Sequence, residues 1–238
     1  MARLAIITGT SSGIGAALAE RLLGEGWQVF GLSRRPVELP APYQHLTCDL
    51  ADPAVPQQLA SRLAAELAFN EYSHLALVNN AATPGQRRRF GDLSAAETFR
   101  NMAINLAAPM ALMNLVAELR PANAMLRVVN VSTGLAYRPL PGLADYCASK
   151  AGLHMAGEVL AAEDHGDMAV LSYAPGIVAT EMQTTLRGET AKDFPSVDVF
   201  RAMHEENRLL AANQVLEPIV AFMLDASRRG FYQQRHGE

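Results

Sequence analysis

Short apolar segments alternate along the chain with longer segments in which apolar residues recur at helical spacing. In residues 13–23, Ile14, Leu18 and Leu22 lie four positions apart, which places them on one face of a helix. Near-continuous apolar strands alternating with helices are typical of a parallel sheet covered on both sides. The predicted strands are Leu4–Thr8, Gln28–Leu32, Gln44–Cys48, Leu75–Asn79, Leu126–Ser132, Met168–Tyr173 and Phe231–Gln233, and the predicted helices are Gly13–Leu23, Val55–Ala68, Ser94–Ala117, Asp145–Glu163 and Val215–Leu224.

This pattern predicts an α/β fold: a single doubly wound domain over residues 1–238, with a parallel seven-stranded sheet and helices on both faces. No internal repeat, low-complexity tract or linker divides the chain. Pro36, Pro40 and Pro42 argue against a full helix between the second and third strands. Residues 176–213 follow a strand end and are predicted to be an irregular segment that covers a substrate site.

Composition and charge exclude several kinds of binding partner for this protein. Half of the 238 residues are apolar, enough to bury a large core, and the net charge of −4 offers no general attraction to nucleic acid or anionic lipid. The two cysteines, Cys48 and Cys147, predict no disulfide framework, and the scattered histidines predict no metal site. The first strand begins at once and no apolar run reaches the ~18 residues of a membrane span, so we expect no membrane association and a cytoplasmic location.

A glycine-rich turn, TGTSSGIG (residues 8–15), joins the first strand to the first helix. Glycine lets the backbone approach a pyrophosphate closely, and the unpaired N–H groups and dipole of a helix N-terminus attract an anion. The alternative is a plain strand–helix turn with Ser12 as the N-cap. No lysine follows the turn, which argues against a nucleoside triphosphatase.

Residues 8–15 resemble the T-G-x-x-x-G-x-G fingerprint of the short-chain dehydrogenase/reductases. Four further stretches agree in order and spacing: NNAA (79–82), INLAAP (104–109), VNVSTG (129–134) with YCASK (146–150), and APGIVATEM (174–182). The resemblance covers almost the whole chain and is greatest to the sepiapterin reductase and benzil reductase branch. It implies a Rossmann-like fold, an NAD(P)-dependent oxidoreductase, and a homodimer or homotetramer paired through the two long helices.

The end of the second predicted strand bears on the choice of cofactor. NAD enzymes of this fold carry an acidic residue there, which bonds the ribose 2′-hydroxyl. Here Ser33 stands at that position, followed by Arg34 and Arg35, whose guanidinium groups could clamp a 2′-phosphate. We therefore expect NADP(H) to be preferred over NAD(H). A solvated basic turn is the alternative, and Ser12 stands where NADP-using members often carry a basic residue.

The resemblance implies further cofactor contacts at the strand ends. Asp49 falls where the family contacts adenine, although it could instead be a helix N-cap. Asn79, Ile177 and Thr180 match positions that line the ribose or the nicotinamide carboxamide. The full set of expected cofactor-binding residues is Gly9, Ser11, Ser12, Gly13, Ile14, Gly15, Ser33, Arg34, Arg35, Asp49, Leu50, Asn79, Ala81, Tyr146, Lys150, Pro175, Gly176, Ile177, Thr180 and Met182.

Carbonyl reduction needs a proton donor and a group that holds the substrate oxygen. Tyr146 and Lys150 lie four residues apart and share a helix face. A phenol with a pKa of about 10 is protonated at neutral pH, so reduction is the easier direction, and an ammonium at Lys150 lowers the pKa of a neighbouring phenol. Ser132 would bond the substrate carbonyl oxygen. Alone, Tyr146 and Lys150 would fit a helix start with a surface lysine; behind VNVSTG they fit a catalytic pair.

Asn105 completes the catalytic tetrad of the family. Pro109 lies four residues later and has no N–H, so the carbonyl of Asn105 loses its helical partner and the helix should kink there. A free carbonyl could hold the water through which the family connects its lysine to solvent. An ordinary proline kink with a solvated asparagine is the alternative.

An apolar wall is predicted beside Ser132 from Leu140, Leu143, Met182 and Phe194. It favours a small ketone, aldehyde or α-diketone as the substrate. A pterin is the alternative, although Leu143 replaces an aromatic residue of that branch and its acidic pterin anchor has no evident match. The sequence also leaves open a non-catalytic NADP-binding regulator, which would tend to lose the tyrosine or lysine, and a 3-oxoacyl or sugar-type reductase.

Overall fold

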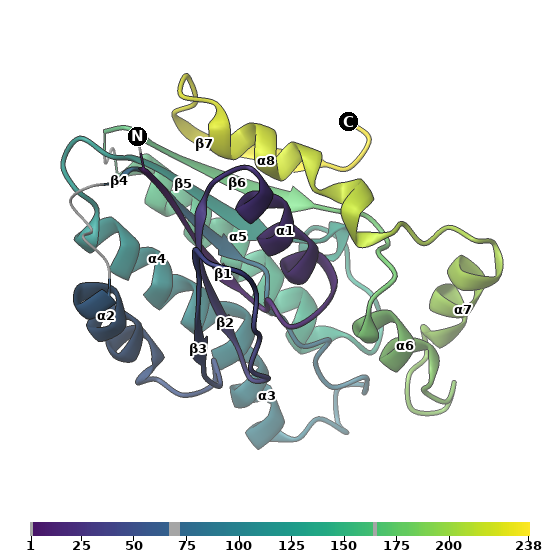
Figure 1. Cartoon of the computed structure of the whole chain (residues 1–238). Coiled ribbons are helices and arrows are strands. Elements are labelled where there is room, and N and C mark those ends of the chain that lie inside the picture. Colours follow the sequence, from purple (N-terminus) through teal and green to yellow (C-terminus); the bar gives the residue numbers. More distant parts are fainter. Residues whose placement is uncertain (1, 67–71, 164–165) are drawn as a thin grey trace.

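The computed structural model describes residues 2–66, 72–163 and 166–238 and shows a seven-stranded sheet in the order β3-β2-β1-β4-β5-β6-β7 (Figure 1). Every neighbouring pair of strands is parallel, which confirms the predicted fold class. The strands are β1 (Ala2–Thr8), β2 (Gln28–Ser33), β3 (Tyr43–Thr47), β4 (Tyr72–Asn79), β5 (Met125–Val131), β6 (Met168–Ala174) and β7 (Gly230–Arg235).

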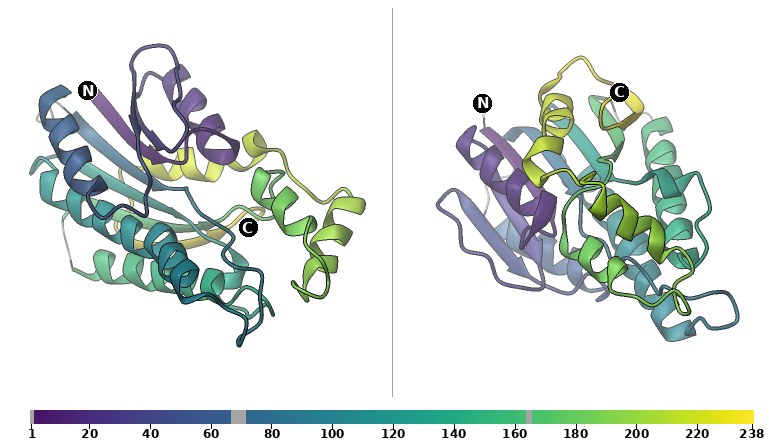
Figure 2. Two further views of the ribbon diagram at one scale, coloured as in Figure 1. Left: turned by 90° about the horizontal axis from the view of Figure 1, so that it is seen from below. Right: turned by 90° about the vertical axis from the view of Figure 1, so that its right-hand side faces the viewer.

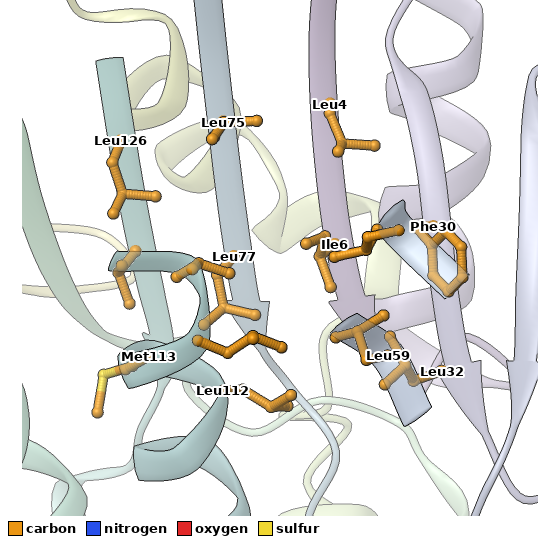
Figure 3. Close-up of a cluster of buried hydrophobic side chains, with 14 of the residues drawn as sticks. Leu4, Ile6, Phe30, Leu32, Leu59, Leu75, Leu77, Leu112, Met113 and Leu126 are labelled. Atoms are coloured by element: carbon orange, nitrogen blue, oxygen red, sulfur yellow. The ribbon is translucent and has the colours of Figure 1, made fainter. Parts of the chain in front are cut away.

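Successive side chains along a strand point to opposite faces of the sheet and pack into two separate hydrophobic cores. In β1, Leu4 and Ile6 join the core beneath α2 (Val55–Glu66), α4 (Ala108–Leu119) and α5 (Ala144–Ala162), which Figure 3 shows in part. Ala5 and Ile7 point the other way, into the core beneath α1 (Gly13–Gly24) and α8 (Glu217–Leu224). The sheet therefore lies between two helical layers (Figures 1 and 2). The predicted helix at residues 55–68 extends beyond α2 by two residues that lie outside the described residues.

One long helical run carries the predicted irregularity at Asn105. It consists of α3 (Ala95–Met102), the π-helical turn η2 (Ala103–Ala107) and α4, so the expected disturbance takes the form of a widened turn. The N–H of Ala108 bonds to the carbonyl of Ala103, five residues back, immediately before Pro109, which has no N–H to offer.

The same run, residues 95–119, is long and apolar enough by length and composition alone to cross a membrane. The sequence pattern predicted no apolar run as long as a membrane span. In the structure, Leu112, Met113 and Val116 are buried against the sheet, as in the core helix of a layered domain.

Residues 176–213 are more regular than predicted. They contain two helices, α6 (Glu181–Arg187) and α7 (Val197–Glu205), which project beyond the carboxyl ends of the strands (Figure 2). Both helices are short and gain their stability from a local apolar cluster of Leu186, Phe194, Val197 and Phe200 around Leu143. The prediction of an irregular segment was therefore wrong for these two helices.

Candidate active site

A cavity of about 660 Å³ opens at the carboxyl ends of the strands. The segments at the ends of β1 to β6 form its walls, and α6 closes one side. Strand β1 is flanked by β2 on one side and β4 on the other, so the direction in which the chain adds strands reverses there. Ligands of open α/β sheets bind at this kind of position.

The glycine-rich turn forms a cradle that a side chain would fill. Gly9 has a φ of +78°, which favours glycine, and a Cβ on Gly15 would lie 2.4 Å from the Gly9 carbonyl oxygen. Ser12 stands at the N-cap position of α1, but its side chain makes no capping hydrogen bond. Ser12, Gly13 and Ile14 line the cavity, so the first turn of α1 fits the pyrophosphate of a dinucleotide.

Ser33, the last residue of β2, lines the cavity together with Arg34 and Arg35, which follow it. The Ser33 hydroxyl donates to the carbonyl of Arg35 at 2.6 Å. The Arg35 guanidinium donates to the Ser11 hydroxyl at 3.4 Å and pairs with Glu181 at 3.1 Å. Arg34 and Arg35 therefore bring guanidinium groups, and no carboxylate of their own, to this part of the cavity.

Asp49 also lines the cavity, and its carboxylate accepts hydrogen bonds from neighbouring residues. It accepts from the Ala51 N–H at 3.0 Å and from Arg100 Nη2 at 2.6 Å. The backbone hydrogen bond and the Arg100 guanidinium hold the pKa of Asp49 below its usual range. Helix α2 begins only at Val55, so Asp49 is not its N-cap.

Three of the four predicted catalytic side chains, Ser132, Tyr146 and Lys150, line the same cavity. Ser132 follows β5, and its hydroxyl oxygen is buried without a partner among the described residues. Tyr146 lies in the first turn of α5, and Lys150 is buried one turn later with its Nζ 6.0 Å from the centre of the Tyr146 ring. Lys150 Nζ donates to the Val131 carbonyl at 2.8 Å. All three side chains line the cavity.

Burial shifts the two titratable groups in opposite directions. It raises the pKa of Tyr146 to about 12, against a lowering hydrogen bond from Thr133. It lowers the pKa of Lys150 to about 8. The sequence predicted that the Lys150 ammonium would lower the pKa of Tyr146, but that pKa is raised, with burial as the largest cause. At neutral pH the phenol is protonated and Lys150 is mostly charged.

Asn105 is fully buried and does not line the cavity. Its side-chain oxygen accepts from the Thr83 N–H at 2.8 Å, and its Nδ2 donates to the Thr83 carbonyl at 2.9 Å and to the Ser149 hydroxyl at 3.3 Å. These bonds fix Thr83, which does line the cavity. The structure thus gives the Asn105 side chain an anchoring position, with its backbone in the π-helical turn.

Several predicted contacts lie behind the cavity wall. Asn79 is buried between strands and donates to Asn130 at 2.9 Å, while the next residue, Asn80, lines the cavity. Phe194 is fully buried against Gly142 and Phe200. The predicted site residues that do not line the cavity are Gly15, Asn79, Asn105, Leu140, Ile177 and Phe194.

Other cavity residues were not predicted from the sequence. Gln183 lines the cavity with its side-chain oxygen buried and without a partner among the described residues. Its position directly after Met182 was the available signal. Leu186 and Phe200 also line the cavity and present apolar side chains from α6 and α7. The remaining unpredicted lining residues include Leu32, Cys48, Asn80, Ala82, Thr83, Pro84, Arg100, Asn101, Ile104, Val131, Thr133, Leu135, Val178 and Glu181.

One cavity is lined both by a helix N-terminus that fits a pyrophosphate and by groups that can hold and protonate a carbonyl oxygen. This arrangement defines a dinucleotide-dependent oxidoreductase. The family model described as short chain dehydrogenase matches residues 3–191, and the chain belongs to the short-chain dehydrogenase/reductase family.

Three comparisons illustrate the relationship. The chain is 30% identical to benzil reductase ((S)-benzoin forming) of Bacillus subtilis (strain 168) over 234 residues, which cover 95% of this chain and 96% of that protein. It is 34% identical to the sepiapterin reductase of Bos taurus over 209 residues, 80% of this chain and 78% of that protein. The crystal structure of the KRED1-Pglu enzyme shares the fold, with a TM-score of 0.85 at 21% identity over 97% of this chain and 100% of that one.

Proposed function

We propose that this oxidoreductase uses NADPH to reduce a small ketone, aldehyde or α-diketone to the corresponding alcohol. The observation that carries the proposal is the Ser132 hydroxyl oxygen, buried without a partner among the described residues in the cavity that Tyr146 and Lys150 also line. Leaving a buried polar group unpaired is costly, and a substrate carbonyl oxygen would pair with this hydroxyl.

The chemistry follows from the three side chains. The reduced dinucleotide, when bound, supplies the hydride to the carbonyl carbon. The Ser132 hydroxyl donates a hydrogen bond to the carbonyl oxygen, and Tyr146 transfers its phenolic proton to that oxygen as negative charge develops there. The Lys150 ammonium stabilises the phenolate that remains. A Tyr146 pKa of about 12 keeps the phenol protonated before the reaction, which supports reduction.

The preference for NADPH over NADH is supported by the residues that follow β2. Ser33 leaves the position of the usual ribose-binding carboxylate uncharged, and Arg34 and Arg35 line the same end of the cavity. A guanidinium binds a phosphate through paired hydrogen bonds as well as through charge. The adenosine 2′-phosphate is the group on NADPH that would meet these arginines.

The substrate end of the cavity supports an apolar carbonyl compound. Leu135, Leu143, Met182, Leu186 and Phe200 line it. The similarity to benzil reductase, whose name specifies an aromatic α-diketone, points to the same class of substrate.

A pterin is the second candidate substrate. The buried side-chain oxygen of Gln183, which has no partner among the described residues, would accept a hydrogen bond from a ring N–H or amino group of a pterin. The similarity to sepiapterin reductase favours the same candidate.

We further propose that the protein forms a homodimer or homotetramer through the outer face of α4 and α5. Met110 on α4 is 47% exposed, and Met155 and Val159 on α5 are 56% and 50% exposed. Both helices cover the same face of the sheet, so a second copy could bury these apolar side chains together.

Initial rates of NADPH and NADH consumption test the proposed reaction. The panel consists of benzil, a simple aldehyde, a 3-oxoester and sepiapterin. We expect the highest kcat/KM with benzil or another apolar carbonyl, and at least a tenfold preference for NADPH. The highest kcat/KM with sepiapterin would favour the second candidate. A preference for the 3-oxoester, or for NADH, would overturn the first proposal.

A further inference from the structure

One guanidinium joins three segments at the adenosine end of the cavity. Arg35, just beyond β2, donates through Nε and Nη2 to the hydroxyl of Ser11 in the glycine-rich turn, at 3.4 Å each. Its Nη1 and Nη2 reach the two carboxylate oxygens of Glu181, at 3.1 and 3.4 Å. Glu181 is the first residue of α6. Arg35, Ser11 and Glu181 all line the cavity.

The carboxylate of Glu181 therefore occupies the Nη1–Nη2 edge of Arg35, one of the two forked pairs of N–H groups through which this guanidinium could bind a phosphate. Arginine binds carboxylate and phosphate through the same forked pair of N–H groups, so both anions cannot occupy that fork at once. The Arg35–Glu181 pair is open to water, with side-chain exposures of 55% and 71%. Exposed ion pairs are weak, so a doubly charged phosphate would displace the carboxylate at a small but measurable cost.

We propose that Glu181 is an internal competitor for Arg35 that weakens binding of the cofactor 2′-phosphate and so sets the degree of discrimination between NADPH and NADH. This inference rests on the NADPH preference proposed above. NADH lacks the phosphate and leaves the pair intact, so Glu181 reduces NADPH affinity selectively. Glu181 begins α6, which also carries the cavity residues Met182 and Gln183. Displacing its carboxylate from Arg35 therefore removes one contact that holds this wall of the site.

Calorimetric titration of the full chain with NADPH and with NADH tests the proposal. The variants are Glu181→Gln, Arg35→Gln and the combination of both. Glu217→Gln is the matched control, because Glu217 also pairs with an arginine, Arg21, at 3.3 Å and is 71% exposed, but does not line the cavity. All three positions are at the surface, so the substitutions should leave the fold unchanged.

We expect Glu181→Gln to tighten NADPH binding about three- to fivefold and to leave NADH binding unchanged. In the Arg35→Gln background the same substitution should have no effect, because the group under competition is gone. Glu217→Gln should change neither affinity. An unchanged NADPH affinity in Glu181→Gln would overturn the inference, and so would a gain that persists without Arg35, since it would indicate simple charge repulsion.

The outcomes separate this inference from the proposal on which it rests. If the unmodified protein binds NADPH no more tightly than NADH, or Arg35→Gln leaves their ratio unchanged, the proposed phosphate site itself is wrong. If that preference exists and Arg35→Gln removes it, but Glu181→Gln has no effect, only the competition is wrong.

Discussion

Burial has opposite chemical consequences for Tyr146 and Lys150. The phenol is neutral when protonated, so burial raises its pKa to about 12, whereas the ammonium is charged, so burial lowers its pKa to about 8. Both shifts suit a reductase, since the acid stays protonated and the neighbouring cation persists at neutral pH. Lys150 nevertheless costs stability, because its charge is held away from water.

Replacing Lys150 by methionine should stabilise the protein at neutral pH. The lysine has a pKa near 10.5 in the unfolded chain and of about 8 in the folded chain. Below pH 8, burying the charged lysine therefore lowers the free energy of unfolding by about 3 kcal/mol. Between pH 8 and 10.5 the unfolded state holds more protons, so the stability of the unmodified protein rises with pH. Lys150→Met should therefore be more stable at pH 7, by up to about 3 kcal/mol, and the difference should shrink towards pH 10.5.

Urea unfolding at several pH values measures this difference. Lys192→Met is the control, because Lys192 is exposed and should give a small difference at every pH. A Lys150→Met variant that is less stable at pH 7, or a gap that does not change with pH, would contradict the burial cost.

At the scale of elements, the strands and long helices were predictable because each has a strong periodic or continuous apolar pattern. Helices α6 and α7 were not, because their stability comes from Leu186, Val197 and Phe200 packing on Leu143, more than forty residues earlier. The contrast between Asn79 and Asn80 shows a second limit. Successive side chains near a strand end point to opposite sides, so an error of one residue exchanges a buried contact for a cavity contact.

At Gly15 in the glycine-rich turn, helix propensity and packing predict opposite effects of a substitution by alanine. Alanine is a better helix former than glycine, yet a Cβ at Gly15 would lie 2.4 Å from the Gly9 carbonyl oxygen and 2.5 Å from Asn80 Nδ2. Gly15→Ala should therefore weaken dinucleotide binding more than tenfold and lower the Tm. Gly24→Ala, in the same helix with nothing within 4 Å of the added Cβ, should leave both nearly unchanged.

Fluorescence titration with NADPH and a thermal melt of both variants measure these effects. Equal behaviour of Gly15→Ala and Gly24→Ala would show that the close approach of the turn to α1 does not matter for binding.

For the whole molecule, the sheet places the ends of six strands around one cavity, so the motif residues at those ends converge although they are far apart in the sequence. This convergence was predictable for Gly9, Ser33 and Ser132 at strand ends, and for Tyr146 in the first turn of α5. The side chains of the covering helices were not, because which of Phe194 and Phe200 faces the cavity depends on how α6 and α7 pack.

The outer face of α4 and α5 supplies a prediction about assembly. Replacing both Met155 and Val159 by glutamate places charges in the proposed interface and should shift the protein towards monomer. Leu224→Glu is the control, since Leu224 is 41% exposed on α8, on the opposite face of the sheet. Sedimentation velocity measures the mass. An unmodified protein that is already monomeric, or a double variant of unchanged mass, would rule out this interface.

The most direct measurement of the central claim is the turnover of Tyr146→Phe with NADPH and its best carbonyl substrate, beside calorimetric binding of NADPH. The substitution removes only the phenolic oxygen, so we expect kcat to fall by about 10²- to 10⁴-fold while the Kd for NADPH changes less than twofold. Tyr137→Phe, a partly exposed tyrosine that does not line the cavity, should retain its kcat. A Tyr146→Phe variant that turns over at the normal rate, or an unmodified protein that binds NADPH and reduces no carbonyl, would contradict the account.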